Sequence, residues 1–298
     1  MANGLGTDGP LQRVAVLGAG AVGGMLGVLL AQAGHDVTLL GSDRTCTAIN
    51  AQGLTLRSRA FGERSASVPA RPWLVGPVDL LVVAVKAPDL LSALTRAPAP
   101  LLEGAAVAPL LNGVDHVALL RAAYPQARVV PMTVGVEATR VAPGVIEHLS
   151  PFADYAVSAE HDTPDGPGAL FAAAGLNLDS SAPDETTLLW RKLAFLAPFA
   201  LLTTSAMDAV GPAREARPGL LDALVAETGA AAVAAGAKVD PDAVRTRLET
   251  LPPTMRSSML KDAVAGATLE LDAIAGPILR SGVAAPVTRE VVREIAAR

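Results

Sequence analysis

A glycine-rich turn follows the first apolar segment of the chain. Residues 14–17 are apolar, as expected of a buried strand, and Gly18-Ala19-Gly20-Ala21-Val22-Gly23 comes directly after them. In this Gly-x-Gly-x-x-Gly pattern, glycine permits a tight strand-to-helix turn and lets the backbone approach a pyrophosphate. An apolar helix is predicted over residues 25–33, and its N-terminus would attract the same phosphates. The glycines could serve packing alone, but a second predicted strand, residues 37–40, favours a dinucleotide-binding βαβ unit.

Length, charge and cysteine content narrow the class of protein. A chain of 298 residues suggests about two domains, and a net charge of −5 with scattered Lys and Arg argues against nucleic acid and anionic membranes as partners. Cys46 is the only cysteine, and no Cys/His cluster has the spacing of metal ligands. Residues 1–11 are expected to form a flexible leader without the features of a signal peptide. The longest uncharged run, residues 193–207, is too short to span a bilayer. We therefore expect a cytoplasmic protein that binds no metal.

Hydrophobic periodicity divides the chain near residue 183. Before that point short apolar runs alternate with helical stretches, which is typical of βαβ units around a parallel sheet. The expected strands are residues 14–17, 37–40, 80–85, 106–110, 129–132, 144–148, 155–157 and 176–178. Helical periodicity follows over residues 185–207, 219–235, 241–248, 255–278 and 287–297. The pattern predicts an α/β Rossmann-type domain over residues 1–182 and an all-α domain over residues 183–298.

Several polar residues stand where a ligand could be bound. Lys86 and Asn112-Gly113 each follow a predicted strand, at the sheet edge where open α/β folds bind ligands. An ordinary turn would explain Asn-Gly equally well. Lys192 opens a long apolar helix, where desolvation would lower its pKa and suit it to proton transfer, although a lysine that extends to solvent fits as well. Glu270 lies in an apolar segment, and a carboxylate there is usually a solvated helix residue.

The order of these features resembles the ketopantoate reductase (2-dehydropantoate 2-reductase) family over nearly the whole chain, residues 13–297. The similar segments are Gly18-Ala19-Gly20-Ala21-Val22-Gly23, Val85-Lys86-Ala87, Asn112-Gly113-Val114, Trp190-Arg191-Lys192-Leu193, Ser257-Ser258-Met259-Leu260-Lys261-Asp262 and Glu270-Leu271-Asp272-Ala273-Ile274-Ala275-Gly276. The resemblance implies an NAD(P)-binding Rossmann domain and a helical domain like the C-terminal domain of 6-phosphogluconate dehydrogenase. That second domain would bind substrate and support dimerisation, since relatives are often homodimers.

The resemblance also implies an activity, the transfer of hydride from NADPH to the ketone of a 2-oxo acid, as in pantothenate biosynthesis. Lys192 matches the family's catalytic lysine, a general acid, and Glu270 its acidic site residue. Asn112 and Ser258 match residues that hydrogen-bond substrate or nicotinamide. The implied cofactor-binding residues are Gly18, Gly20, Ala21, Val22, Gly23, Ser42, Arg44, Lys86, Asn112 and Glu270.

Two positions on the predicted helix depart from the family pattern and bear on the substrate. The family usually has asparagines four and eight residues after the catalytic lysine, and this chain has Leu196 and Ala200 there. Since a site built on hydrogen bonds discriminates through them, we expect a bulkier or more apolar carbonyl substrate than 2-dehydropantoate. The lost amides also leave a second hypothesis, a relative that performs a non-redox step or only binds a ligand.

A third departure bears on the cofactor. After the second strand the family usually has an arginine that binds the 2′-phosphate of NADPH, and this chain has Ser42. Ser42 and Arg44 could share the phosphate, whereas Asp43 could instead bind the ribose hydroxyls of NADH. Because no carboxylate stands at position 42 itself, the sequence favours NADPH over NADH.

Overall fold

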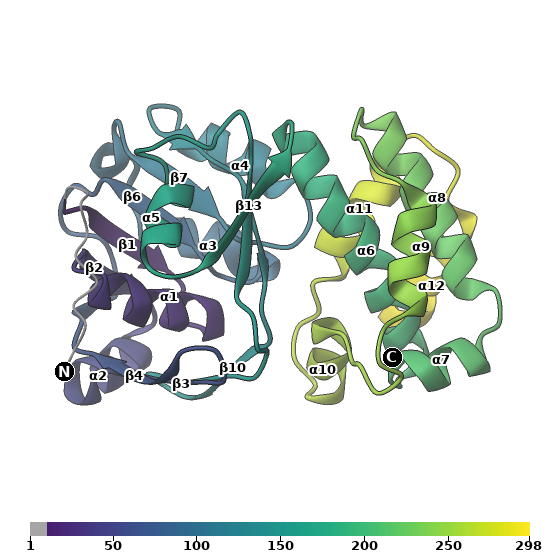
Figure 1. Ribbon diagram of the computed structural model, residues 1–298, viewed down its shortest axis with the longest axis horizontal. Coiled ribbons are helices and arrows are strands. Elements are labelled where there is room, and N and C mark those ends of the chain that lie inside the picture. Colours follow the sequence, from purple (N-terminus) through teal and green to yellow (C-terminus); the bar gives the residue numbers. More distant parts are fainter. Residues whose placement is uncertain (1–10) are drawn as a thin grey trace. The chain divides into compact units, whose positions relative to one another are not determined.

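The computed structural model describes residues 11–298 and divides the chain into two units (Figure 1). The first unit comprises the chain up to Leu111 together with His116–Pro183, and the second comprises Asn112–Asp115 together with Asp184–Arg298. The predicted leader lies, except for Leu11, outside the described residues. A four-residue turn within the first half of the sequence thus packs with the C-terminal unit.

A six-stranded parallel sheet forms the core of the first unit. Its strand order is β5-β2-β1-β6-β7-β8, with β1 at Arg13–Leu17, β2 at Asp36–Leu40, β5 at Ala70–Arg71, β6 at Leu80–Val83, β7 at Ala106–Pro109 and β8 at Arg128–Val129. The helices that connect these strands are α1 (Ala21–Gln32), α2 (Asp43–Gln52), α3 (Leu90–Leu94) and α4 (His116–Ala123), with short 3-10 turns at Ala87–Asp89 and Ala99–Leu102. Strand β6 is buried along its whole length, as expected of a strand covered on both faces. The predicted Rossmann-type architecture is confirmed.

Two smaller sheets complete the first unit. One has the order β10-β11-β3-β4, from Ala138–Ala142, Val145–His148, Leu54–Ser58 and Gly62–Ala66. The other has the order β13-β12-β9, from Asn177–Ala182, Asp154–Ser158 and Met132–Gly135, and α5 (Pro167–Ala173) contacts β12 and β13. Sequence periodicity missed β3, β4, β5 and β10. Strands β4 and β10 are largely exposed, and β5 has only two residues. The single strand predicted over residues 129–132 is wrong: the chain breaks there into β8 and β9, which belong to different sheets.

The second unit is helical throughout its described secondary structure. It contains α6 (Glu185–Ala206), α7 (Val210–Ala216), α8 (Leu220–Ala234), α9 (Pro241–Glu249), α10 (Ser258–Val264), α11 (Leu271–Arg280) and α12 (Pro286–Ala296). The longest helix, α6, contacts all six others and is drawn among them in Figure 1. Asp184 begins it by accepting a hydrogen bond from the backbone N–H of Thr187 (2.6 Å).

The continuous helical stretch predicted over residues 255–278 is wrong. Helix α10 ends at Val264, Gly266 takes a positive φ of 63°, and α11 begins only after Glu270. Helix α7 was not predicted from the sequence either. Among the described residues no single helix is long and apolar enough to cross a membrane, and α6 and α7 reach that criterion only as a pair bent by 71°.

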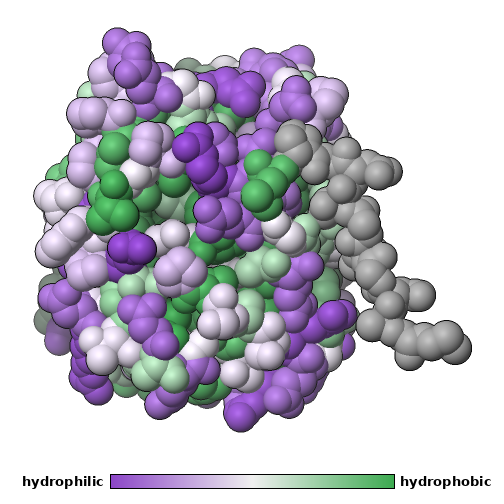
Figure 2. Space-filling model, turned by 90° about the vertical axis from the view of Figure 1, so that its left-hand side faces the viewer, coloured by the Kyte–Doolittle hydropathy of each residue, from purple (hydrophilic) through white to green (hydrophobic). Residues whose placement is uncertain are grey.

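Each unit has its own hydrophobic core. The first core joins the parallel sheet and α1 to the small sheets, and the second is built around α6. Figure 2 shows one face of the molecule, on which hydrophilic side chains separate the apolar residues. The exposed apolar residues of this face are therefore dispersed.

We predict that Phe171→Ala destabilises the first unit by about 3–5 kcal/mol, since it leaves a cavity where a ring was packed. Phe171 is fully buried on α5, and its ring lies edge-on to that of Tyr155 at 5.2 Å. Urea unfolding followed by circular dichroism measures the change. Phe152→Ala, at a ring that is 44% exposed, is the control and should change the free energy of unfolding little. Equal effects of the two substitutions would contradict the packing described here.

Candidate active site

The turn after β1 has a separate physical reason for each of its three glycines. Gly18 has a φ of +105°, and its N–H donates to the carbonyl of Leu40 (3.0 Å). A Cβ at position 18 would lie 2.9 Å from the backbone of Ala84, and one at position 23 would overlap the carbonyl oxygen of Gly18. A Cβ at Gly20 would meet nothing within 4 Å. The first and third glycines therefore fix the turn, and the second faces open space where a ligand can approach.

The N-terminus of α1 fits a pyrophosphate. Gly20 is the N-cap and has no side chain that could cap the helix. The first turn carries no acidic residue. The first backbone N–H groups of a helix have no partner within the helix, so those of Ala21, Val22 and Gly23 can meet an anion.

Beyond β2, Ser42 has a structural contact that the sequence did not indicate. It is the N-cap of α2: its hydroxyl accepts from the N–H of Thr45 (3.4 Å) and lies 3.0 Å from the Thr45 hydroxyl. Asp43 and Arg44, in the first turn of α2, are exposed. Lys86 is also exposed and follows β6 beyond its carboxyl end.

Two further arginines lie at these turns and were missed by sequence reasoning. Arg96 donates from one nitrogen to the carbonyl of Gly41 (2.9 Å), the residue immediately before Ser42, and to the carbonyl of Pro72 (2.7 Å). Arg140, on β10, donates to the carbonyl of Ala19 in the glycine turn (3.4 Å). Arg96 lies in the turn after α3, and Arg140 lies on β10 of a separate sheet. Each is an isolated arginine in the sequence, and only tertiary packing brings it to these turns.

In the second unit the structure brings together two residues that are 158 positions apart. The side-chain amide of Asn112 donates to Oε2 of Glu270 (3.0 Å). Glu270 is only 7% exposed and stands at the N-cap position of α11. A nearly buried carboxylate needs hydrogen bonds or a positive charge, and Asn112 supplies one of them.

Lys192, on α6, is electrostatically coupled to the same carboxylate. Burial lowers the pKa of Lys192 to about 8, and the negative charge of Glu270 opposes that shift. The residue as a whole keeps some exposed surface. An ammonium with a pKa near 8 is charged at neutral pH and gives up its proton readily, as a general acid must.

The remaining predicted substrate residues differ in their surroundings. Ser258 is exposed in the first turn of α10. Its neighbour Ser257 is buried, accepts from the N–H of Leu260 (3.1 Å) and bonds the Thr203 hydroxyl of α6 (2.8 Å). Leu196 is half-buried, whereas Ala200 is fully buried in the second core and presents no surface to a ligand.

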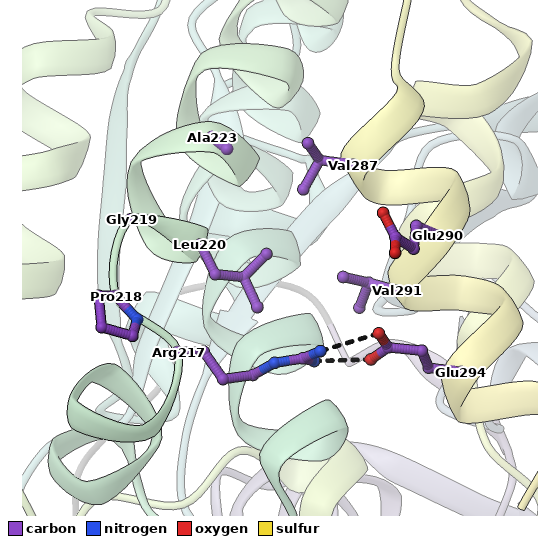
Figure 3. Close-up of a pocket in the computed structure, with 9 residues that line it drawn as sticks. All are labelled: Arg217, Pro218, Gly219, Leu220, Ala223, Val287, Glu290, Val291 and Glu294. Carbon is purple, nitrogen blue, oxygen red and sulfur yellow. Dashed lines mark hydrogen bonds and ion pairs between the residues drawn. The ribbon is translucent and has the colours of Figure 1, made fainter.

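A cavity of about 340 Å³ lies elsewhere in the second unit, between α8 and α12 (Figure 3). Arg217 and Glu294 form an ion pair at one side of it (2.7 Å). Its lining contains none of the predicted site residues; the lining residues are Arg217, Pro218, Gly219, Leu220, Ala223, Val287, Glu290, Val291 and Glu294.

Comparison with known proteins covers both units. The family described as ketopantoate reductase PanE/ApbA matches residues 14–159, and its C-terminal counterpart matches residues 185–298. The 2-dehydropantoate 2-reductase of Mycobacterium tuberculosis is 32% identical over 95% of this chain and 97% of its own length. The structure of a PanE/ApbA family ketopantoate reductase from Ralstonia eutropha JMP134 superposes with a TM-score of 0.84 at 30% identity, covering 95% of this chain and 97% of that one.

A further solved structure shares the fold alone. A ternary complex of D-mandelate dehydrogenase with NADH and anilino(oxo)acetate has a TM-score of 0.83 at 22% identity, over 95% of this chain and 97% of that one. The two family matches and the relatives at 30% identity or more show more than the fold. The chain belongs to the ketopantoate reductase PanE/ApbA family, and it is a 2-dehydropantoate 2-reductase-like oxidoreductase.

Proposed function

We propose that this protein reduces the ketone of a 2-oxo acid with hydride from NADPH, and that Lys192 protonates the oxygen. The observation that carries the proposal is the lysine of lowered pKa coupled to a nearly buried carboxylate. NADPH, when bound, supplies the hydride. Lys192 is protonated below a pH of about 8 and can stabilise and then protonate the alkoxide that hydride transfer creates.

Glu270 and Asn112 have distinct roles in this proposal. The charge of Glu270 keeps the pKa of Lys192 higher than burial alone would leave it, and thereby keeps the acid protonated at neutral pH. Asn112 uses one amide hydrogen on Glu270. Its second amide hydrogen and its carbonyl oxygen are left for the substrate or the nicotinamide. Ser258, exposed at the start of α10, would add a hydroxyl contact to the substrate.

The proposed substrate is 2-dehydropantoate or a bulkier, more apolar 2-oxo acid. Leu196 supports the second option, because it is half-buried one helical turn after Lys192 and offers no hydrogen bond. Ala200 contributes only indirectly, since it is fully buried. The same fold in D-mandelate dehydrogenase accommodates anilino(oxo)acetate, so aryl 2-oxo acids belong among the candidates.

The proposed cofactor is NADPH. Support comes from Arg44, an exposed residue two positions after Ser42, and from the absence of a carboxylate at position 42. Asp43 lies in the first turn of α2 and is the residue that would favour NADH. The family leads us to expect also a homodimer, a cytoplasmic location and a role in pantothenate biosynthesis. Size-exclusion chromatography tests whether the protein is a homodimer.

We expect NADPH oxidation when the protein is given a panel of 2-oxo acids that includes 2-dehydropantoate, apolar alkyl and aryl members. Lys192→Ala should lower kcat at least a hundredfold, the size of a general-acid contribution, and leave the Kd for NADPH nearly unchanged. Absorbance at the nicotinamide band measures turnover, and fluorescence titration measures binding. No oxidation with any member of the panel, or product formed without nicotinamide, would overturn the proposal in favour of a non-redox role.

The rate of reduction should depend on pH through Lys192. The group is protonated below its pKa, so kcat/KM should be constant near neutral pH and fall tenfold per pH unit above about 8. Glu270→Gln removes the charge that raises the pKa of Lys192, and the descending limb should move to lower pH. A limb that stays in place in this variant would show that another group titrates.

Cofactor preference should depend on Arg44. Arg44→Ala is expected to weaken NADPH binding about tenfold, the effect of losing one hydrogen bond to a charged group, and to leave NADH binding unchanged. Arg128→Ala is the matched control, because Arg128 is an exposed arginine at the amino end of β8, the edge of the sheet opposite the ligand. Equal loss of NADPH and NADH affinity would argue against a contact to the 2′-phosphate.

A further inference from the structure

An ion-pair cluster joins the turn that carries Asn112 to the helix that begins after Glu270. Arg280, at the end of α11, donates to Oδ1 of Asp272 (2.7 Å) and to Oδ2 of Asp115 (2.6 Å). Asp272 belongs to the same helix, whereas Asp115 closes the Asn112–Asp115 turn, 165 positions away. The guanidinium therefore bridges the helix and the turn.

Gly276 makes room for this bridge. It lies four residues from both Asp272 and Arg280, on the same face of α11. A Cβ at position 276 would overlap Nη2 of Arg280 and lie 2.6 Å from Oδ1 of Asp272. Glycine is unfavourable inside a helix, and the path of the Arg280 side chain gives this one a physical reason.

The turn also fits the helix through its backbone. Gly113 has a φ of +84°, and a Cβ there would overlap the carbonyl oxygen of Ala273 in the first turn of α11. Val114 packs against the second core. The turn therefore packs directly on α11 at Gly113, between Asn112 and the ion pair of Asp115.

We propose that Arg280 is a positioning residue, which holds the Asn112–Asp115 turn on α11 and thereby keeps the Asn112 amide on Glu270. The inference rests on the proposed function of Asn112 and Glu270. The side chains of Arg280 and Asp115 are 52% and 50% exposed. Exposed ion pairs add little to folding stability, so the effect falls on the geometry of the site.

Arg280→Met should lower kcat/KM for the best 2-oxo acid about tenfold, because a small displacement of a group that orients the substrate has a large effect on rate. Arg280→Lys should restore part of the loss, since an ammonium can meet the carboxylates but cannot hold both in a fixed fork. Gly276→Ala should also lower kcat/KM while the melting temperature holds or rises, because alanine favours the helix.

Arg245→Met is the matched control. Arg245 forms another exposed ion pair of the second unit, with Asp222 of α8 (3.1 Å), and its loss should leave kcat/KM unchanged. Wild-type kcat/KM in both Arg280→Met and Gly276→Ala would overturn the proposal.

A double-mutant comparison separates positioning from a general structural role. If Arg280 acts through Asn112, then Arg280→Met should cause no further loss of kcat/KM in the Asn112→Ala protein. If the double variant instead loses kcat/KM by the full product of the two single-variant losses, Arg280 acts by another route and the proposal is overturned.

Hydrogen exchange of the unliganded protein tests the inference without turnover. Peptides that cover Asn112–Asp115 should take up deuterium faster in Arg280→Met than in the wild type and in Arg245→Met. Unchanged uptake would overturn the role of Arg280. If the wild-type protein reduces no 2-oxo acid, the proposed function fails, and exchange still decides whether Arg280 holds the turn.

Discussion

A nearly buried carboxylate, that of Glu270, is the constraint around which the candidate site is arranged. A charge with 7% exposure is costly unless neighbouring groups compensate it. Asn112 donates to it, and the ammonium of Lys192 is coupled to it electrostatically. Asn112 comes from the turn after β7, and that turn packs with the helical unit.

The first unit is governed by a different constraint, the lack of space around its glycine turn. Side chains at positions 18 and 23 would collide with backbone, whereas position 20 faces open space. The turn is therefore rigid on its protein side and accessible on the other. The uncapped N–H groups of α1 lie at that accessible side, which is the arrangement a pyrophosphate requires.

Much of this could be predicted from the sequence. The parallel strands around the glycine turn were predictable because they are buried runs with clear boundaries, and α6 because its helical periodicity is long. Exposed strands such as β4 and β10 bury neither face, so their apolar and polar residues do not alternate with a period of two. The resemblance to the family pointed to Asn112, Lys192 and Glu270, and the structure joins Asn112 to Glu270. The resemblance could not reveal that Ser42 caps α2 or that Ala200 is fully buried, since both depend on three-dimensional contacts.

By itself, the sequence determined the glycine-rich turn, the two-part α/β and helical architecture, and the residue types available at the candidate site. These are encoded locally, in glycine positions, strand and helix periodicity, and short ordered motifs. Only the tertiary structure decided the pKa of Lys192, the partner of Glu270, and the bridge that Arg280 makes between α11 and a turn 165 positions away. Burial and hydrogen bonding between distant segments set these properties, and no local pattern records which distant segments meet.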